Sequence, residues 1–522
     1  MSKSLKLGPD LAAGIASNEL IEGKPLLGHV GQDAVLLTQL GDTYSAVSAV
    51  CAHYHGPLEK GLVVGETVRC PWHHACFSLR TGEVLAAPGL TSLPRWQVER
   101  QNLRLYVRDK LQPITRAVRT PPLSATPPAS VLIVGGGAAG EAAATTLRFS
   151  GYQGPVTILS AEDSLPPDRP NLSKDYLAGT APKAWVPIRG EAYFEKNNIA
   201  LKRATHVSSI DAAHKSVRTS DGREFGYDRL LLATGADPVK LPTPGIELPH
   251  VHYVRTVTDS ESIIQAVQAG AKNAVIIGAS FIGLEVAAAL RARNLEVHVV
   301  GPEARPLERV LGPQLGDAIR TLHENKGVVF HLGHTVTNIE SHHVLLNDGK
   351  ALAADLVVIG VGVRPAIALA EQAGLRMDRG VLVDEYLQTS APHIYAAGDI
   401  ARWPDRHTGM HIRVEHWVVA QRQGQTAARN MLGYQQPYKA IPFFWSQHYD
   451  AAVNYVGHAE TWDSLEIDGD PTQLDCAVSY KLGGKLLARA TINRDLLSLK
   501  TEVQMEMENA EPNFYDVAVT LD

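Results

Sequence analysis

The chain has 522 residues, of which 45% are hydrophobic and 20% are charged, and its formal net charge is −6. This length is enough for about three or four domains, and the composition is that of a globular chain rather than a disordered or fibrous one. The slight acidity argues against nucleic acid or an anionic membrane as partner. The four cysteines show no disulfide framework, and we find neither an export signal nor an apolar run of about 18 residues. We therefore expect a cytoplasmic protein.

The first part of the chain reads as a small all-β module. Up to about residue 110, short β-prone runs at 34–37, 44–50, 68–70 and 103–107 alternate with glycine turns. The next segment, up to Pro128, contains Pro113, Pro121, Pro122 and Pro127 and offers little to bury. Such a composition predicts a stiff linker.

Two short turns within the β module carry metal-ligand residues. Cys51-Ala52-His53 and Cys70-Pro71-Trp72-His73 each present one sulfur and one imidazole nitrogen. A Rieske [2Fe–2S] centre needs this set, with two Cys on one iron and two His on the other. The same four residues would also satisfy a tetrahedral zinc site.

The surroundings of the two turns favour the iron–sulfur cluster. CAHYHGPLEKG and CPWHHACFSLRTGEV resemble the two cluster-binding loops of Rieske ferredoxins. We therefore predict Cys51, His53, Cys70 and His73 as the metal ligands. The resembled family usually has glycine where this chain has His74, which leaves two alternatives: His74 could replace His73 as ligand, or stay exposed and titrate near neutral pH. The CxxH spacing selects His73.

A strand, a glycine turn and a helix are predicted next. The apolar run 131–134 enters Gly135-Gly136-Gly137-Ala138-Ala139-Gly140, and an alanine-rich helix extends to about Phe149. Without side chains, the backbone can approach a pyrophosphate at the positive end of the helix. A second strand, 156–159, ends near Glu162, at about the spacing expected for a carboxylate that binds ribose hydroxyls. The predicted dinucleotide-binding residues are Gly135, Gly137, Ala138, Ala139, Gly140 and Glu162.

The same pattern recurs after a strand at 274–277. It continues as Gly278-Ala279-Ser280-Phe281-Ile282-Gly283-Leu284-Glu285, with the next strand at 297–300. Gly278, Ser280 and Gly283 therefore predict a second nucleotide site, in which serine replaces the middle glycine. Glu303 favours NADH, whereas Arg305 and Arg309 lie close enough to keep NADPH as an alternative.

Residues 129–522 resemble the two-dinucleotide-binding-domain flavoprotein reductases, in the branch of ferredoxin reductases and apoptosis-inducing-factor-like proteins. The likeness rests on Asp168-Arg169-Pro170 with Leu172-Ser173-Lys174, Ala233-Thr234-Gly235, Gly362-Val363-Arg364-Pro365 and Ile394-Tyr395-Ala396-Ala397-Gly398-Asp399. With the Rieske module in front, the chain is most similar to the Rieske-bearing apoptosis-inducing-factor-like proteins. The implied fold is multidomain: an all-β Rieske domain (1–110), a linker (111–128), Rossmann-like α/β domains for FAD (129–243 and 374–432) and NAD(P)H (244–373), and an α+β C-terminal domain (433–522).

The resemblance also implies roles for single residues. FAD would be held by the first glycine loop with Glu162, Arg169, Lys174, Ala233, Thr234, Gly235, Gly362 and Asp399, and the second loop with Glu303 would hold the nicotinamide nucleotide. Lys174 would pair with Glu285 beside the flavin N5, which makes both catalytic candidates. Each also has an ordinary interpretation, Glu285 as an acid near its own helix N-terminus and Lys174 as a solvated loop residue. Trp445 is a candidate wall for the isoalloxazine or an ordinary core aromatic.

The positions of the cysteines limit which groups on this chain can carry electrons. No cysteine lies between Cys76 and Cys476, so a redox dithiol on this chain is excluded. A hydride carries two electrons and the cluster accepts one at a time, which places FAD between them. Histidine ligation raises the cluster potential to roughly −150 to +300 mV, against about −400 mV for all-cysteine plant-type clusters. We therefore predict an enzyme that passes electrons from NAD(P)H through FAD and the Rieske cluster to an unidentified one-electron acceptor.

Two other functions are consistent with the same residues. The chain could be an NADH-responsive redox sensor whose reduction changes its self-association, for instance as a homodimer. It could also be the reductase component of an oxygenase system, with the Rieske domain in place of a separate ferredoxin.

Overall fold

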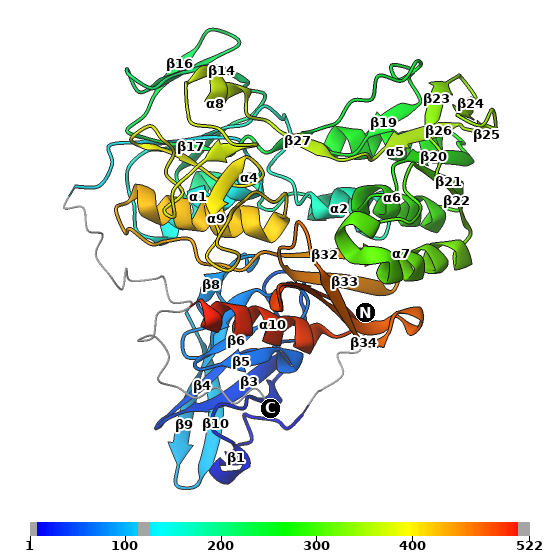
Figure 1. Cartoon of the computed structure of the whole chain (residues 1–522). Coiled ribbons are helices and arrows are strands. Elements are labelled where there is room, and N and C mark those ends of the chain that lie inside the picture. Colours follow the sequence, from blue (N-terminus) through cyan, green and yellow to red (C-terminus); the bar gives the residue numbers. More distant parts are fainter. Residues whose placement is uncertain (1–7, 113–125, 510–522) are drawn as a thin grey trace.

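The computed structural model describes residues 8–112 and 126–509. Figure 1 shows an all-β unit at the bottom of the view, two α/β units at the top, and the C-terminal unit between them. Most of the predicted proline-rich linker falls outside the described residues. The predicted fold class, a β domain followed by two α/β domains and an α+β domain, is confirmed.

Two antiparallel sheets form the N-terminal unit, ordered β1-β10-β9-β4-β3-β2 and β5-β6-β7-β8. The strands are β1 (Ile15–Ala16), β2 (Leu26–Val30), β3 (Asp33–Leu40), β4 (Thr43–Ser48), β5 (Leu62–Val64), β6 (Thr67–Arg69), β7 (Cys76–Ser78), β8 (Val84–Ala86), β9 (Arg95–Gln101) and β10 (Arg104–Leu111), with the 3-10 turns η1 (Ser17–Glu19) and η2 (Leu58–Lys60). Each predicted run overlaps a strand, although β4 ends at Ser48 and β6 ends at Arg69. The last strand continues to Leu111, because it keeps pairing with β9 beyond a bulge.

The core of this unit lies directly beneath the two cysteine turns. Leu36, Val47, Val68 and Phe77 are fully or almost fully buried and pack in one cluster that includes both predicted cysteine ligands. Burying this apolar surface stabilises the fold and also holds the base of each turn in place.

A five-stranded parallel sheet, ordered β13-β12-β11-β17-β29, forms the first α/β unit. Its strands are β11 (Val131–Val134), β12 (Val156–Leu159), β13 (Ile199–Lys202), β17 (Arg229–Leu232) and β29 (Ile394–Ala396). The predicted helix is α1 (Ala138–Phe149), and it packs against α9 (Trp417–Met431). A Cβ on Gly424 would lie 2.2 Å from the carbonyl oxygen of Ala139, so glycine is needed where the two helices meet.

Shorter elements surround this sheet. They are α2 (Pro170–Ser173), α3 (Asp175–Ala178), η3 (Lys183–Trp185), α4 (Glu191–Lys196), α8 (Ala368–Gln372), and the strands β14 (Val207–Asp211), β15 (Ser216–Thr219), β16 (Glu224–Gly226), β18 (Ala236–Pro238), β27 (Val363–Pro365), β28 (Val381–Leu382), β30 (Ala401–Pro404) and β31 (His411–Ile412). The β18–β27 pair joins the two α/β units where the chain passes between them.

The second α/β unit repeats the design of the first. Its parallel sheet is ordered β19-β26-β20-β21-β22. The elements are β19 (Val251–Tyr253), α5 (Val257–Gln268), β20 (Asn273–Ile277), α6 (Phe281–Ala292), β21 (Glu296–Gly301), α7 (Glu308–Asn325), β22 (Val328–Leu332), β23 (Val336–Ile339), β24 (His343–Leu346), β25 (Ala351–Ala353) and β26 (Leu356–Ile359). The recurrence read from the sequence is therefore a structural repeat.

An antiparallel sheet ordered β32-β33-β36-β35-β34 and one helix form the C-terminal unit. The elements are β32 (Phe443–His448), β33 (Ala451–Gly457), β34 (Ser464–Asp470), η4 (Pro471–Gln473), β35 (Asp475–Leu482), β36 (Lys485–Ile492) and α10 (Asp495–Glu508). Helix α10 packs on β33 and β36 and also contacts β5 of the N-terminal unit. The C-terminal unit therefore connects the β domain to the α/β domains.

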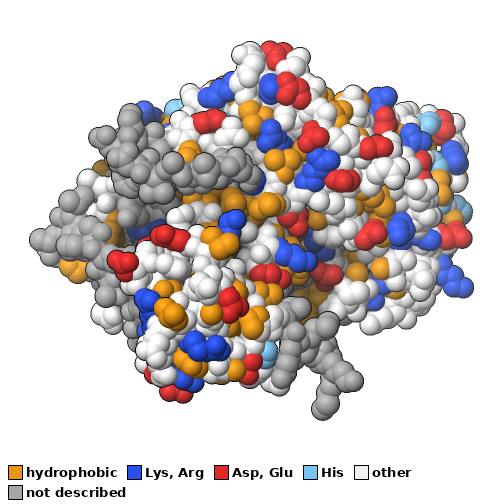
Figure 2. Space-filling view, turned by 90° about the horizontal axis from the view of Figure 1, so that it is seen from below, with side chains coloured by type: hydrophobic (Ala, Val, Ile, Leu, Met, Phe, Trp, Pro, Cys, Tyr) orange, Lys and Arg blue, Asp and Glu red, His pale blue; other side chains and the backbone are white. Residues whose placement is uncertain are grey.

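The face seen from below in Figure 2 carries Lys/Arg and Asp/Glu side chains mixed together, without a large area of one sign on its described part. None of the described helices is long and apolar enough to cross a membrane.

Candidate functional site

The two predicted ligand turns have the same backbone geometry. In the first, the Cys51 amide donates to Gly56 O at 2.9 Å; in the second, the Cys70 amide donates to Ala75 O at 2.9 Å. The fifth residue of each turn, His55 or His74, has a φ of 60°. A left-handed backbone suits glycine, which explains why the resembled family has glycine where this chain has His74.

The four predicted ligands lie as two pairs. The Cys51 and Cys70 thiols interact with each other, and the Nδ1 atoms of His53 and His73 lie 3.1 Å apart. Within residues 8–112 and 126–509, no three His, Cys, Asp or Glu side chains converge closely enough to hold one ion. Zinc would need all four residues around one point, whereas a Rieske cluster needs only two protein ligands for each iron. The arrangement therefore fits a [2Fe–2S] cluster.

Burial prepares these side chains to act as ligands. It lowers the pKa of His53 to about 3 and that of His73 well below its ordinary value, so both rings are neutral and have a free lone pair. A Cβ on Gly56 would lie 2.8 Å from Cys70 Sγ, so only glycine leaves room beside that sulfur. The Rieske domain would supply the iron–sulfur chemistry at this point.

His74 points away from the ligand pairs. It is fully buried, its Nδ1 lies 2.8 Å from Glu502 Oε2, and its ring stacks on Phe443 with centroids 3.9 Å apart. The alternative that His74 stays exposed is therefore wrong. Cys76 is partly buried, and burial raises the pKa of its thiol.

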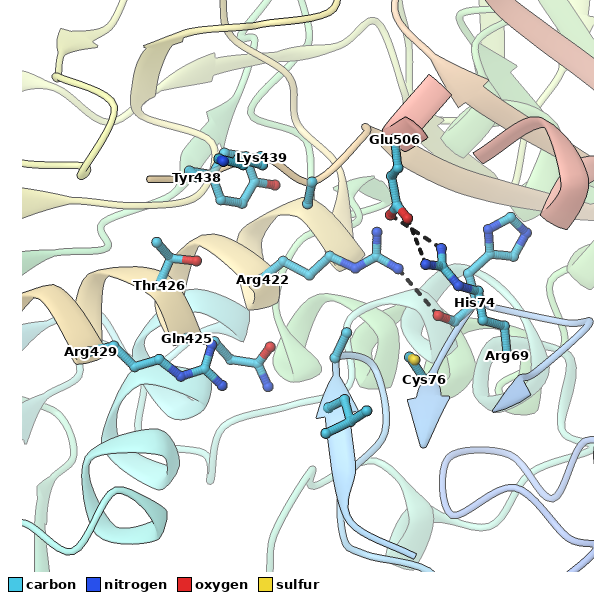
Figure 3. Close-up of a pocket in the computed structure, with 13 residues that line it drawn as sticks. Arg69, His74, Cys76, Arg422, Gln425, Thr426, Arg429, Tyr438, Lys439 and Glu506 are labelled. Carbon is cyan, nitrogen blue, oxygen red and sulfur yellow. Dashed lines mark hydrogen bonds and ion pairs between the residues drawn. The ribbon is translucent and has the colours of Figure 1, made fainter. Parts of the chain in front are cut away.

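His74 belongs to a buried ion network that joins three domains. Arg422 of α9 contacts Glu502 of α10 at 2.6 Å and donates to His74 O at 3.2 Å, while Arg69 of β6 contacts Glu502 at 3.2 Å and Glu506 at 2.6 Å. Figure 3 shows Arg69, His74, Arg422 and Glu506 of this network around a cavity of about 170 Å³. Burial alone would raise the pKa of Glu502, but Arg422 and its other partners hold it well below the usual range.

The first glycine loop lies across the carboxyl ends of β11 and β17. Gly135 has a φ of 114°, and an added Cβ there would lie 2.1 Å from Ala233 O. Gly140 is equally tight, because its Cβ would lie 1.9 Å from Gly135 O. Gly137 caps α1, so that Ala138 and Ala139 form the first turn of the helix. The amides at this helix start form an anion-binding site of the kind that holds a pyrophosphate.

The polar residues predicted around this loop come together. Arg169 Nη2 lies 2.5 Å from Glu162 Oε1, whereas Glu162 Oε2 is buried without a hydrogen-bond partner. Arg255 contacts Asp399 at 3.2 Å, and Gly235 lies so close that a Cβ there would be 2.8 Å from the Arg255 guanidinium. A buried carboxylate oxygen without a donor fits a ribose hydroxyl, so Glu162 fits the ribose in the ADP half of FAD.

Two further residues predicted for this site flank it. Thr234 donates its hydroxyl to Ala366 O at 2.7 Å, and Gly362, which follows β26, has a φ of 108°. Both lie beside the β18–β27 pair that joins the two α/β units.

The second glycine loop repeats this geometry and shows why it contains a serine. The Ser280 hydroxyl accepts from the Gly283 amide at 3.2 Å and caps α6, and it donates to Gly360 O at 2.6 Å. Gly278 has a φ of 113°. Glu303 Oε2 is buried without a partner at the end of β21, so it can accept from a ribose hydroxyl in the way proposed for Glu162. Arg305 is already paired with Asp317 at 2.9 Å.

Lys174 and Glu285 meet between the two α/β units. Lys174 Nζ lies 2.8 Å from Glu285 Oε2, and the two side chains are 15% and 3% exposed. Glu285 also accepts from Ser173 Oγ and from Ser446 Oγ, both at 2.6 Å. Lys174 is therefore not a solvated loop residue, and Glu285 is held by three donors.

The histidine side of the β domain is docked against the rest of the protein. The Trp445 ring centroid lies 4.1 Å from that of His73 and 6.5 Å from that of His53. Tyr54, next to His53, hydrogen-bonds through its hydroxyl to Asp168 and lies 3.1 Å from Asn171 Nδ2. Trp445 thus faces the ligand histidines, and its predicted contact with the isoalloxazine remains a prediction.

Sequence reasoning did not identify several of these contacts. It assigned no role to Tyr54, Asp168, Glu502 or Ser446. Asp168 lies inside a segment that resembles the flavoprotein reductases, which was the one available signal; nothing in the linear sequence pairs Tyr54 with Asp168.

Comparison with known families agrees with this arrangement. Residues 13–97 match the Rieske [2Fe-2S] domain, and residues 129–424 match the family described as pyridine nucleotide-disulphide oxidoreductase. The chain belongs to the pyridine nucleotide-disulphide oxidoreductase family. It carries a Rieske domain in front, which confirms the resemblance stated from the sequence.

Several known proteins are similar over most of the chain. Apoptosis-inducing factor 3 of Homo sapiens is 33% identical over 483 residues, which cover 90% of this chain and 79% of that protein. Rhodocoxin reductase of Rhodococcus erythropolis is 35% identical and covers 73% of this chain and 91% of its own length. The crystal structure of the covalent putidaredoxin reductase–putidaredoxin complex matches with a TM-score of 0.71 and 35% identity, over 74% of this chain and 95% of that chain.

This membership defines the class of chemistry. The protein is an FAD-dependent NAD(P)H oxidoreductase with a Rieske domain, so the predictions of FAD, NAD(P)H and a [2Fe–2S] cluster are confirmed. Although the family is named for disulphides, the cysteines of this chain are Cys51, Cys70, Cys76 and Cys476, and none of the four forms a disulfide.

Proposed function

We propose that electrons from NAD(P)H pass through FAD to the Rieske cluster of the same chain and then to an external one-electron acceptor. The supporting observation is the contact between Trp445 and His73, which sets the histidine edge of the cluster site against the reductase part of the chain. FAD accepts a hydride and can release its electrons singly, and the protein positions the partners.

The contact between Tyr54 and Asp168 supports the same route. Asp168 immediately precedes Arg169, which lies beside the first glycine loop and contacts Glu162. One segment therefore contacts both the β domain and the proposed flavin site. A domain docked in this way needs no diffusion step before it receives an electron, because the encounter is intramolecular.

The individual residues have distinct proposed roles. The first glycine loop, Glu162, Arg169 and Asp399 bind FAD, and the second loop binds the nicotinamide nucleotide. Lys174 and Glu285 face the site of hydride transfer, where the carboxylate holds the ammonium group in position. Glu303 favours NADH, because its buried oxygen suits ribose hydroxyls and would repel a 2′-phosphate. Arg305, already paired with Asp317, is a weaker phosphate ligand.

The external acceptor is proposed to be a small electron-carrier protein or a small molecule. One similar structure is a reductase captured with putidaredoxin. In this chain the docked Rieske domain would take the place of such a separate partner. We propose that the protein acts in a reducing compartment such as the cytoplasm, because none of its cysteines forms a disulfide among the described residues.

The test is an anaerobic titration of the holoprotein with NADH, and separately with NADPH. Flavin reduction is followed by absorbance and the cluster by low-temperature EPR. We expect flavin bleaching followed by a Rieske signal, with NADH effective at lower concentration. Bleaching without a cluster signal in protein that contains two irons per chain would contradict the internal route. A Cys70→Ser variant, which should lack the cluster, is the control for the assignment of the signal.

A further inference from the structure

A line of buried side chains leads from Glu285 away from Lys174. Ser446 Oγ lies 2.6 Å from Glu285 Oε1 and 3.2 Å from His448 Nε2. His448 Nδ1 lies 3.2 Å from His323 Nε2. Ser446 is 1% exposed, and both histidines are fully buried. Ser446 and His448 share one face of β32, because side chains alternate along a strand, and His323 comes from α7.

The direction of every hydrogen bond in this line follows from its first member. An ionised carboxylate only accepts, so Ser446 must donate its proton to Glu285. His448 must then donate from Nε2 to Ser446 Oγ, which leaves His448 Nδ1 as an acceptor. That acceptor requires a proton on His323 Nε2. His323 Nδ1 is left as a bare lone pair, and it is buried without a partner.

We propose that His323, His448 and Ser446 form a proton relay to Glu285. This inference rests on the proposed function, in which Glu285 lies beside the site of hydride transfer. A proton that binds His323 Nδ1 releases the Nε2 proton to His448 Nδ1. His448 then releases its Nε2 proton to Ser446, and Ser446 releases its own to Glu285. One proton enters, one O–H bond forms on Glu285, and no electron moves.

The relay supplies a proton where the chemistry needs one. Bound FAD would supply the redox chemistry, and its reduction by a hydride would take up one further proton. Glu285 would hold that proton at the site, where a positioned donor speeds proton transfer. Passage of one proton reverses every donor in the line, so the line must carry a proton back from Glu285 before it can deliver another.

The surroundings of the two histidines suit this role. Burial, and then the charge of Lys174, lowers the pKa of His448 to about 3, so the ring stays neutral with one N–H to pass on. Burial also lowers the pKa of His323 well below its ordinary value. His323 lies in the last turn of α7, and the next residues, 324–327, are exposed. The outer end of the relay therefore lies next to an exposed stretch of chain and beside the Tyr449 ring, and Lys326 Nζ lies 5.6 Å from the centroid of that ring.

The direct test measures the protonation of the two histidines in the wild-type protein. Histidine is labelled with ¹⁵N in the oxidised holoprotein, and the two resonances are assigned by their loss in His448→Gln and His323→Gln. We expect both rings to be neutral at pH 7 and to carry the proton on Nε2. A proton on Nδ1 of His448, or a charged ring, would overturn the proposal, because the line would then not point to Glu285.

The functional test compares matched variants in a stopped-flow experiment with excess NADH in H₂O and in D₂O. We expect His448→Gln and Ser446→Ala to slow flavin reduction on the order of tenfold and to change the solvent isotope effect. This decrease is smaller than the effect of losing an acid–base group outright, because Glu285 itself remains in both variants. His331→Gln is the control, since its ring also pairs with a histidine, His298, at 3.0 Å, but has no link to Glu285.

The outcomes separate the two proposals. If both relay variants that fold and bind FAD react at the wild-type rate in both solvents, the relay is wrong. If NADH does not reduce the wild-type protein at all, the proposed function fails. The histidine tautomers are measured independently and still show whether the hydrogen bonds of the line donate toward Glu285.

Discussion

The rings of His73 and Trp445 lie 4.1 Å apart, with an angle of 48° between their planes, although one belongs to the Rieske domain and the other to strand β32 of the C-terminal domain. A predicted iron ligand thus contacts an aromatic side chain whose strand also carries Ser446, a partner of Glu285. The shared strand brings the cluster site and the proposed hydride-transfer site close together.

Replacing Trp445 should slow electron arrival at the cluster more than flavin reduction. Trp445→Ala removes the ring that covers His73, and it should destabilise the protein by about 3 kcal/mol if the gap does not close. Trp445→Phe should retain most of the rate. Rapid mixing with NADH, with the flavin and the cluster followed separately, measures both steps. Trp185, which is 67% exposed, provides the control Trp185→Ala. Equal cluster reduction in all variants would contradict a role for Trp445.

A substitution at His73 should remove the cluster, whereas a substitution at His74 should leave it in place. His73→Ala should lose the Rieske EPR signal and most of the iron, because one iron loses a ligand. His74→Gln should keep both, because His74 contacts Glu502 and Phe443 instead of the ligand pairs. Iron analysis and EPR of the purified proteins decide between these ligands. Loss of the cluster in His74→Gln alone would reverse the assignment.

Removing the charge of Glu285 should slow hydride transfer. Glu285→Gln keeps the size of the side chain but leaves Lys174 without its carboxylate partner. We expect the rate of flavin reduction at saturating NADH to fall about 10²-fold, which is typical when an acid–base group is lost. FAD content, measured by absorbance, should not change. A rate that falls only through a weaker Kd for NADH would show that Glu285 serves binding instead.

Breaking the buried network at Glu502 should loosen the docking of the Rieske domain. Glu502 is fully buried between Arg422 and Arg69, so Glu502→Gln leaves buried charges uncompensated at a cost of about 3 kcal/mol. Chemical denaturation and limited proteolysis measure the effect. The control Glu324→Gln breaks the exposed pair with Arg320 and should change stability by about 0.5 kcal/mol or less. Equal effects of the two substitutions would show that the network does not hold the domains.

Asp168 should make stability depend on pH in the mildly acidic range. Burial raises the pKa of Asp168 to about 6, above its ordinary value of 3.8. The folded state therefore holds this proton more tightly than the unfolded state, and stability falls as pH rises from about 4 to about 6, by on the order of 3 kcal/mol. Asp168→Asn should remove this component from a thermal unfolding series over that pH range. An unchanged pH profile in Asp168→Asn would assign the dependence to another group.

Much of the molecule could be predicted from local patterns. The strand–glycine–helix signal at 131–149 gives β11 and α1 at their predicted limits, because the spacing of apolar residues and the glycine turn act over a few residues. The two ligand turns could also be predicted, because the Cys and His of each turn lie within four consecutive residues of the chain. The open carboxylate oxygens of Glu162 and Glu303 lie near the strand ends where the spacing placed an acid.

The sequence by itself therefore determined the domain types, the ligand turns and the cofactors. Only the tertiary structure decided how the domains meet: Tyr54 with Asp168, His73 with Trp445, and Arg69 and His74 with Glu502. It also decided that Ser446, His448 and His323 continue the line from Glu285. These contacts join residues that are far apart in sequence, and they depend on how whole domains pack, which no local periodicity or spacing records.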